Sequence, residues 1–278
     1  MVYNMSTMNR QASLVFGDFH FHTTYSDNED KATVRQMVDA GRARGLRTMA
    51  PADHHHSLTP ADWAALLDDI DELAKSDTGD QLYEACEISF RRGHLVAIRP
   101  EGFPRRVADA FRILYEKRCE AMIIAHPVRI VDRWRHILYP AVDGIEVING
   151  EVLRYFRKRR IPFRRFDSIP MLSLYKHYLR AGLPVAAVGS SDAHRIPSVG
   201  FGVTGLWLHS ADDTAMDAIR ERRCYAATDT GVFMKWSLDG RTLSWETAID
   251  GGAPRKVRVY RGSKRICAVA SRGDMTLA

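Results

Sequence analysis

The sequence predicts an α/β fold: a distorted (βα)7 barrel followed by a small C-terminal antiparallel β element. Three observations support this prediction. Short apolar runs alternate with stretches of helical periodicity from about residue 14 to residue 227. Histidine, aspartate or glutamate stands at or near the end of many of these runs. Beyond about residue 231 the chain changes to short alternating strands separated by glycine-containing turns.

The first predicted strand carries the strongest local signal. Its apolar run at 14–16 continues into a segment in which Phe19 and Phe21 alternate with His20 and His22. Both imidazoles should therefore leave one face of the strand, about 7 Å apart. That spacing suits two ligands of one metal ion. A lone His-x-His pair is more often simply hydrogen-bonded, so the argument depends on the ligand-type residues that follow later runs.

The remaining barrel elements are expected in the following order. Helical periodicity covers 32–44, where Gly45 ends it, and Thr59 with Pro60 marks the start of a second helix that runs to 75. Further helices are expected at 106–119, 151–160, 168–181 and 212–222. Strands are expected at 46–50, 81–90, 94–98, 121–125, 142–148, 184–188, 203–208 and 224–227, with a hairpin-like bend at 91–93.

The division into domains follows from the change of pattern. Residues 1–230 are expected to form the barrel and residues 231–278 a β-rich extension packed on it, with strands at 232–238, 243–249, 256–260 and 266–270. The extension contains no cluster of ligand-type residues, so it is assigned to packing or assembly.

Composition narrows the function classes. The 278 residues carry a net charge of +6 and include no apolar run of signal-peptide or membrane-span length, so the cytoplasm is the expected location. The four cysteines are far apart, which argues against a disulfide framework. Arginines and aromatic residues interleave at 154–165. This segment is either a nucleic-acid contact surface or, more commonly for such a run, a solvated helix end. The oligomeric state stays open.

Seven motifs together resemble the PHP (polymerase and histidinol phosphatase) family of metal-dependent hydrolases. They are DFHFHTTYSD at 18–27, ADHHHS at 52–57, CEIS at 86–89, GHLVAI at 93–98, AHP at 125–127, EVIN at 146–149 and GSSDAH at 189–194. Within the family, RCYAATDTG at 223–231 and the β tail look like the branch that includes carbaryl hydrolases. The resemblance implies a distorted (βα)7 barrel, similar to a TIM barrel, with two or three divalent ions (manganese, zinc or iron).

Carried onto this sequence, the resemblance implies nine metal ligands. One ion would be held by His20, His22, Glu87 and Asp192, a second by Glu87 with His94 and His126, and a third by Asp27, His54 and His194. These imidazoles and carboxylates suit borderline or hard divalent cations. In the hypothetical mechanism, bridged ions lower the pKa of a shared water, and the hydroxide attacks the substrate in line with the leaving group.

Other residues receive supporting roles in this hypothesis. Asp18 and Asp53 are expected to orient ligand imidazoles. The expected substrate contacts are Arg129, Arg195 and Asn149, although each arginine fits a surface salt bridge and Asn149 a plain turn residue equally well. His55 and His56 are either proton donors to the leaving group or exposed loop residues.

The sequence supports three functions. The first is a metal-dependent phosphoesterase acting on a small phosphate ester or a nucleotide, favoured by the basic loops around residues 91 and 129. The second is a hydrolase of carbamates or carboxylic esters with the same metal site, favoured by the branch resemblance. The third is not an enzyme but a metal-stabilised protein that binds nucleic acid through residues 154–165.

Overall fold

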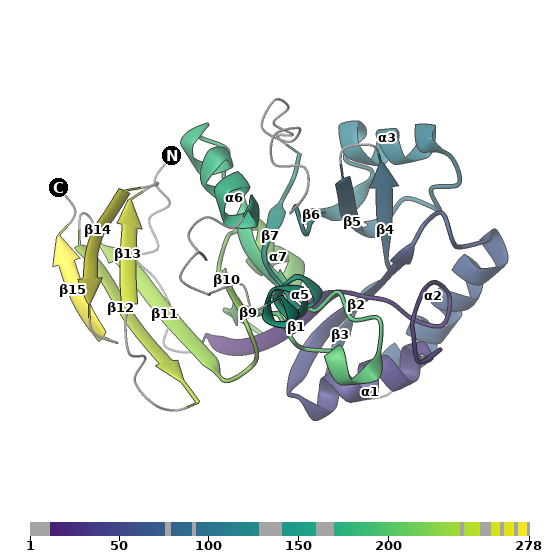
Figure 1. Ribbon diagram of the computed structural model, residues 1–278, viewed down its shortest axis with the longest axis horizontal. Helices are drawn as coiled ribbons and strands as arrows, with labels where there is room; N and C mark the ends of the chain where they lie inside the picture. The colour runs from purple at the N-terminus through teal and green to yellow at the C-terminus, as the bar shows by residue number, and fades with distance from the viewer. Residues whose placement is uncertain are drawn as a thin grey trace.

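The structure is a computed structural model that describes residues 12–75, 79–90, 93–127, 141–159, 170–239, 242–250, 257–261, 264–269 and 272–276. A curved sheet with helices packed outside it forms the main body, and a group of antiparallel strands at the C-terminal end stands beside it (Figure 1). In the described part of the chain, no helix is long and apolar enough to cross a membrane.

The main sheet has ten strands in the order β10-β9-β1-β2-β4-β5-β6-β7-β8, with β3 paired to β2. Their bounds are β1 Ser13–Phe21, β2 Leu46–His54, β3 Gln81–Leu82, β4 Ala85–Phe90, β5 Gly93–Pro100, β6 Cys119–Ala125, β7 Gly144–Asn149, β8 Ala186–Ser190, β9 Val203–Leu208 and β10 Cys224–Ala227. The segment after β8 returns to β1, where the amide of His22 donates to the carbonyl of Ala193 at 2.8 Å. The sheet therefore nearly closes, and the predicted barrel-like fold is confirmed.

The strand directions are more mixed than in a regular (βα) barrel. Strand β1 is parallel to β2 but antiparallel to β9, and β5 is antiparallel to both β4 and β6. The connection between β4 and β5 is too short for the crossover of roughly a dozen residues or more that a parallel pair needs. The two strands accordingly pair antiparallel, as a hairpin does, with His94 opposite Ser89. Residues 91 and 92 of the expected bend lie outside the described residues.

The helices are α1 Val34–Ala43, α2 Pro60–Ala74, α3 Val107–Glu116, α5 Gly150–Lys158, α6 Pro170–Arg180 and α7 Ala215–Arg220, with a 3-10 turn, η2, at Ile196–Ser198. As predicted, Thr59 caps α2, where its side chain accepts from the amide of Asp62. Helix α1 buries Val34, Met37, Val38 and Gly41, one stripe along its axis. This stripe packs with Leu46 and Met49 of β2 in the largest apolar cluster, where each fully buried large side chain stabilises the fold by roughly 1.5–3 kcal/mol.

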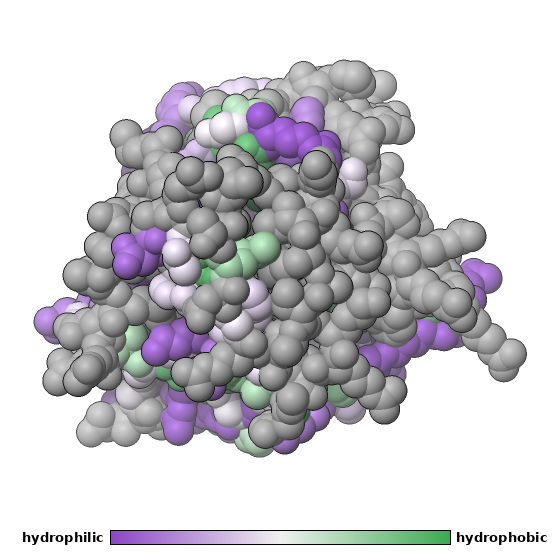
Figure 2. Space-filling model, turned by 90° about the vertical axis from the view of Figure 1, so that its left-hand side faces the viewer, coloured by the Kyte–Doolittle hydropathy of each residue, from purple (hydrophilic) through white to green (hydrophobic). Residues whose placement is uncertain are grey.

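The C-terminal strands form two antiparallel sheets, which confirms the predicted β element. One sheet contains β11 Val232–Asp239, β12 Thr242–Ile249 and β15 Arg272–Thr276, and the other contains β13 Val257–Arg261 and β14 Lys264–Val269. Strand β15 has no apolar alternation in its sequence, RGDMT, and was therefore not expected. On the face that carries these strands, hydrophilic and hydrophobic patches alternate among the coloured residues (Figure 2).

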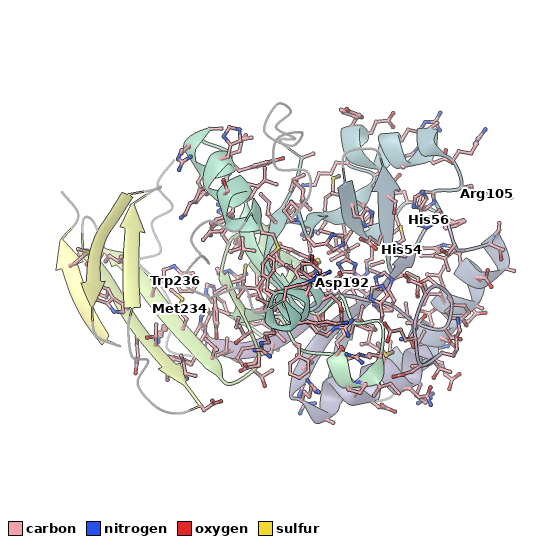
Figure 3. The ribbon with its side chains drawn as sticks, in the orientation of Figure 1. His54, His56, Arg105, Asp192, Met234 and Trp236 are labelled. Carbon is pink, nitrogen blue, oxygen red and sulfur yellow. The ribbon has the colours of Figure 1, made fainter. Side chains whose placement is uncertain are left out.

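Hydrogen bonds attach the first tail strand to the barrel. The indole of Trp207 donates to the carbonyl of Met234 at 3.1 Å, and the hydroxyl of Tyr225 donates to the carbonyl of Val232 at 2.8 Å. The ring of Trp236 meets Tyr225 edge-on, and Figure 3 shows Met234 and Trp236 between the tail and the barrel. These contacts involve β9, β10 and β11 only.

Candidate metal centre

The nine predicted ligands converge at one end of the barrel. They come from the ends of β1 and β2, from the β4–β5 hairpin, and from the segments that follow β6 and β8. Figure 3 marks His54 and Asp192 in this region. Within each of four overlapping groups, every residue offers a ligand atom, and these atoms lie within 4.8 Å of one another. The groups are His20, His22 and Asp192; His20, Glu87 and His126; His54, Glu87 and His94; and His22, Asp27, His54 and His194.

Glu87 lies at the centre of the cluster and is fully buried. Its Oε1 is 2.5 Å from His94 Nδ1 and 2.9 Å from His126 Nε2. Its Oε2 is 2.7 Å from His54 Nδ1 and 3.5 Å from His20 Nε2. His22 Nε2 also lies 3.6 Å from Oε2. One carboxylate thus faces five imidazoles, the arrangement expected of a ligand shared between ions. The antiparallel pairing of β4 and β5 brings His94 into the cluster, as expected from the sequence.

The two aspartates stand on either side of His22. Asp192 Oδ1 is 3.2 Å from His22 Nε2 and 3.5 Å from His20 Nε2. Asp27 Oδ2 is 3.2 Å from His194 Nε2 and 3.6 Å from His54 Nε2. Asp27 is about half exposed whereas Asp192 is nearly buried. The third predicted subsite therefore lies at the solvent side of the cluster.

The electrostatics of the cluster follow from burial opposed by neighbouring charges. Burial alone would raise the pKa of Glu87, but the charge of His20 and hydrogen bonds from the surrounding imidazoles hold it well below its usual range. Burial opposes the charged form of His54, yet the nearby carboxylates of Asp27 and Glu87 outweigh it and raise the pKa of His54 to about 10. The pKa of His126 rises to about 9 because Asp192 and Glu87 outweigh its burial. The carboxylate of Glu87 is thus ionised, and the negative charge of the cluster favours positively charged partners, either protonated imidazoles or bound cations.

Three atoms in the cluster test whether a cation fits. Among the described residues, His20 Nε2, His54 Nδ1 and Glu87 Oε2 are buried without a directed hydrogen bond, although they lie close to one another. A buried polar atom without a partner costs about 1–3 kcal/mol. All three are atoms that ligate divalent ions, and a cation between them would satisfy all three at once. The donor set fits zinc, manganese or iron.

Two of the candidate ligands have strained backbones. His126 has φ +23° and Asp192 has φ +52°, both in the left-handed region. Such conformations cost about 1–3 kcal/mol each for residues other than glycine and concentrate at functional sites. Neighbours hold them in place: the amide of His126 donates to Glu146 Oε2 at 2.7 Å, and the amide of Asp192 donates to the carbonyl of His20 at 2.7 Å.

Glu146 is a site residue whose role was not predicted from the sequence. It lies in β7, is fully buried, and its Oε1 is 2.9 Å from His20 Nδ1. The side chain of Asn149 donates to Glu146 Oε2 at 2.9 Å and to Asp192 Oδ2 at 3.3 Å, while its oxygen caps α5 through the amide of Val152. Asn149 is fully buried and hydrogen-bonded on both sides, so it is more than a plain turn residue, and its expected contact with substrate stays a prediction.

The orienting roles expected of Asp18 and Asp53 stay a prediction. Asp18 accepts from the amides of Ser191 at 2.9 Å, Gly200 at 3.2 Å and His20 at 3.3 Å, and burial raises its pKa to about 6. Asp53 accepts from the amide and hydroxyl of Thr23 at 2.8 and 2.6 Å and from the hydroxyl of Ser26 at 2.5 Å. That hydroxyl lies 3.3 Å from His22 Nδ1, so Asp53 reaches a ligand imidazole through Ser26. Asp18 contacts the backbone of the ligand segments.

The structure describes both predicted proton donors, His55 and His56, and one of the two predicted substrate-binding arginines, Arg195. His55 is half-buried, and its Nδ1 accepts from the amide of Ser89 at 3.2 Å, so only Nε2 can carry the proton of the neutral ring. His56 is exposed, with its ring centroid 5.0 Å from that of His54. Arg195 directly follows His194, and its Nε donates to Ser198 Oγ at 3.2 Å. Arg129 lies outside the described residues.

The basic segment at 154–165 is described only as far as residue 159. In this part, Arg154 pairs with Glu151 at 2.6 Å and the guanidinium of Arg159 covers the ring of Tyr155 at 5.5 Å. Both contacts are local to helix α5.

Comparisons with known proteins agree with this fold. A family model described as PHP-associated matches residues 179–224. A two-domain protein from Bacteroides vulgatus ATCC 8482, containing a predicted PHP-like metal-dependent phosphoesterase, is similar with a TM-score of 0.51 and 17% identity, over 94% of this chain and 86% of that one. PsfC from Pseudomonas syringae PB-5123 is similar with a TM-score of 0.55 and 16% identity, over 78% of this chain and 93% of that one. No curated protein matches the sequence.

At these identities the structural likeness concerns the fold, and the sequence match covers the segment from the end of α6 to β10. The chain therefore has the fold of a PHP-like protein and carries a PHP-associated segment at residues 179–224.

Proposed function

We propose that the protein is a metal-dependent phosphoesterase whose active site is the cluster around Glu87. The observation that carries this proposal is the convergence of nine imidazoles and carboxylates on a few buried atoms that lack hydrogen bonds. A purely structural cluster would pair those atoms, because leaving them unpaired is costly. The proposal also draws on the fold shared with a protein that contains a PHP-like phosphoesterase.

The ligands proposed are the nine residues of the cluster, with Glu87 shared between ions. Divalent ions held there would lower the pKa of a bound water towards neutrality and withdraw charge from a phosphoryl oxygen. The protein's own contribution is orientation. Glu146 accepts from Nδ1 of His20, which fixes the imidazole tautomer and leaves Nε2 free to face Glu87 and Asp192.

His56 is the proposed proton donor to the leaving group. It is exposed at the rim next to His54, whereas the hydrogen bond of His55 Nδ1 to the β4 backbone directs that ring towards a structural role. We place this chemistry in residues 1–230 and give residues 231–278 a packing role.

The proposal is tested with three substrates and two variants. Protein reconstituted with manganese or zinc is assayed on bis(p-nitrophenyl) phosphate, p-nitrophenyl phosphate and an aryl carbamate. Asp192→Asn should lose about a thousandfold or more in kcat/KM, because metal ions supply several kcal/mol of transition-state stabilisation. The matched control is Asp39→Asn, since Asp39 is 55% exposed and pairs with Arg42 on the outside of α1.

The outcome also separates the two hydrolase classes. Turnover of a phosphate ester that Asp192→Asn abolishes and Asp39→Asn preserves is the expected result. Turnover of the carbamate alone would assign the same centre to carbonyl hydrolysis, the activity suggested by the branch resemblance. Equal activity of the two variants on every substrate would remove the cluster from catalysis altogether.

A further inference from the structure

A small cavity lies next to residues of the candidate metal centre. It has a volume of about 200 Å³ and is enclosed by helix α5, the segment around η2, and residues 228–229. Arg154, Arg157 and Arg195 line it, together with Glu151 and Asp229. The cavity is smaller than the roughly 300–1,000 Å³ of sites that take drug-sized ligands. Its size suits a single compact group.

The charges in the cavity are unequally paired. Glu151 is occupied by Arg154 at 2.6 Å, and Asp229 accepts from the amide of Gly231 at 2.9 Å and the hydroxyl of Thr228 at 3.0 Å. Among the described residues, Arg157 and Arg195 have no carboxylate within ion-pair distance, and Arg195 donates to the hydroxyl of Ser198. The cavity lining therefore holds three arginines against two carboxylates, and two of those arginines are without an ion-pair partner in the described part of the chain. Guanidinium forks match phosphate oxygens.

The backbone around the cavity holds its walls together but is not expected to bind an anion. The amides at the start of α5 are already used, since Glu151 donates to the carbonyl of Ser191 and Val152 donates to Asn149. A Cβ on Gly150 would overlap the carbonyl oxygen of Phe201, so helix and segment are in close backbone contact. The two walls of the cavity are therefore fixed against each other, and anion binding depends on the arginines.

Both walls begin at the candidate metal centre. Helix α5 starts directly after Asn149, which donates to Asp192, and the opposite wall starts with Arg195, directly after His194. Two residues that line the cavity, Gly150 and Arg195, are therefore chain neighbours of residues at the centre.

We propose that this cavity binds a phosphate group, and that Arg157 and Arg195 hold there a second, non-reacting phosphate of the substrate. The second part rests on the proposed function and deepens it: the substrate would carry two phosphates, as a 5′-phosphorylated oligonucleotide does. The first part requires only that the cavity take phosphate.

Binding is tested without turnover. Thermal unfolding of Asp192→Asn protein is followed in sodium phosphate, sodium acetate and sodium chloride at matched ionic strength. Phosphate should raise Tm in a saturable way, by mass action on the folded state. The rise should vanish in the Arg157→Gln, Arg195→Gln variant and persist in Arg35→Gln, Arg118→Gln, whose arginines pair with Glu72 and Glu101 on the surface. An equal rise in acetate, or one that survives loss of the cavity arginines, would overturn the phosphate site.

The substrate role is tested with two dinucleotides, pTpT and TpT, which share one phosphodiester and differ by the 5′-phosphate. In the metal-loaded protein, kcat/KM should favour pTpT by about ten- to hundredfold, the value of one or two charge-assisted hydrogen bonds. The preference should fall to near one in the cavity variant and stay in the surface control. Cleavage of both dinucleotides at equal rates by the wild type would refute this role while leaving the phosphoesterase proposal intact. Absence of any phosphoester turnover would refute the proposed function, and the Tm series would still decide whether the cavity takes phosphate.

Discussion

Substitution of Glu146 by glutamine is the sharpest test of how the protein prepares its metal ligands. The carboxylate is buried and receives three donors: Nδ1 of His20 at 2.9 Å, the amide of His126 at 2.7 Å and the side chain of Asn149 at 2.9 Å. Glutamine keeps the size but offers one accepting oxygen, and its amide group points two hydrogens at donors. At least one buried donor then lacks a partner.

The expected size of the effect follows from these contacts. An unpaired buried donor costs about 1–3 kcal/mol, and hydrogen bonds to a charged group weaken when the charge is lost, so the free energy of unfolding should fall by about 2–4 kcal/mol. Loss of the group that orients a ligating imidazole should weaken metal binding about 10- to 100-fold. Urea unfolding measures the first quantity and competition with a coloured chelator for zinc or manganese measures the second.

The control is Glu72→Gln, because Glu72 is 72% exposed and pairs with Arg35 on the surface. An exposed pair contributes about 0–1 kcal/mol, so the free energy of unfolding of Glu72→Gln should fall by no more than that. Its affinity for metal should stay that of the wild type. Metal affinity of Glu146→Gln within twofold of the wild type would refute the positioning role, even if the variant proved less stable.

Three more predictions concern the centre, the helix beside it and the tail. Removal of metal with EDTA should lower Tm by about 5–10 °C, the effect of losing a ligand present at about 100 times its Kd, and manganese should restore it; an unchanged Tm would contradict metal binding. Asn149→Ala should lower the free energy of unfolding in urea by about 2–4 kcal/mol, because it removes the α5 cap and bonds to two buried carboxylates; a loss below 0.5 kcal/mol would argue against that role. Burial raises the pKa of Tyr225 to about 12, above the ordinary value of 10.0, so its stabilising contribution is complete below pH 10 and is lost as the pH rises to 12. The stability difference between wild type and Tyr225→Phe should therefore narrow over that range in urea unfolding, and a constant difference would contradict the shift.

Most of the candidate metal ligands could be placed from the sequence because they stand at the end of an apolar run. His22, His54 and His126 lie where strands reach the rim, whereas Glu87 lies within β4. The strand directions were less predictable, because β9 pairs antiparallel with β1 and β6 pairs antiparallel with β5, and local periodicity does not specify which strands pair.

The contacts that support the candidate ligands were harder to predict from the sequence. Glu146 meets His20 across 126 positions of chain, and only the fold brings them together. The one local signal was a carboxylate within an otherwise apolar strand, GIEVIN, which requires a buried partner. Asp18 stands next to the His-x-His motif, but its orientation depends on the amides of Ser191 and Gly200, which come from a distant loop.

The shared position of Glu87 has a consequence for how the centre fills. Its two oxygens face different imidazoles, two at Oε1 and three at Oε2, so a first cation bound there would withdraw electron density from the carboxylate that a second would need. Successive occupancies would then be unequal, and the subsites would not be loaded or emptied independently. A titration with metal would show stepwise weakening in place of identical, non-interacting steps.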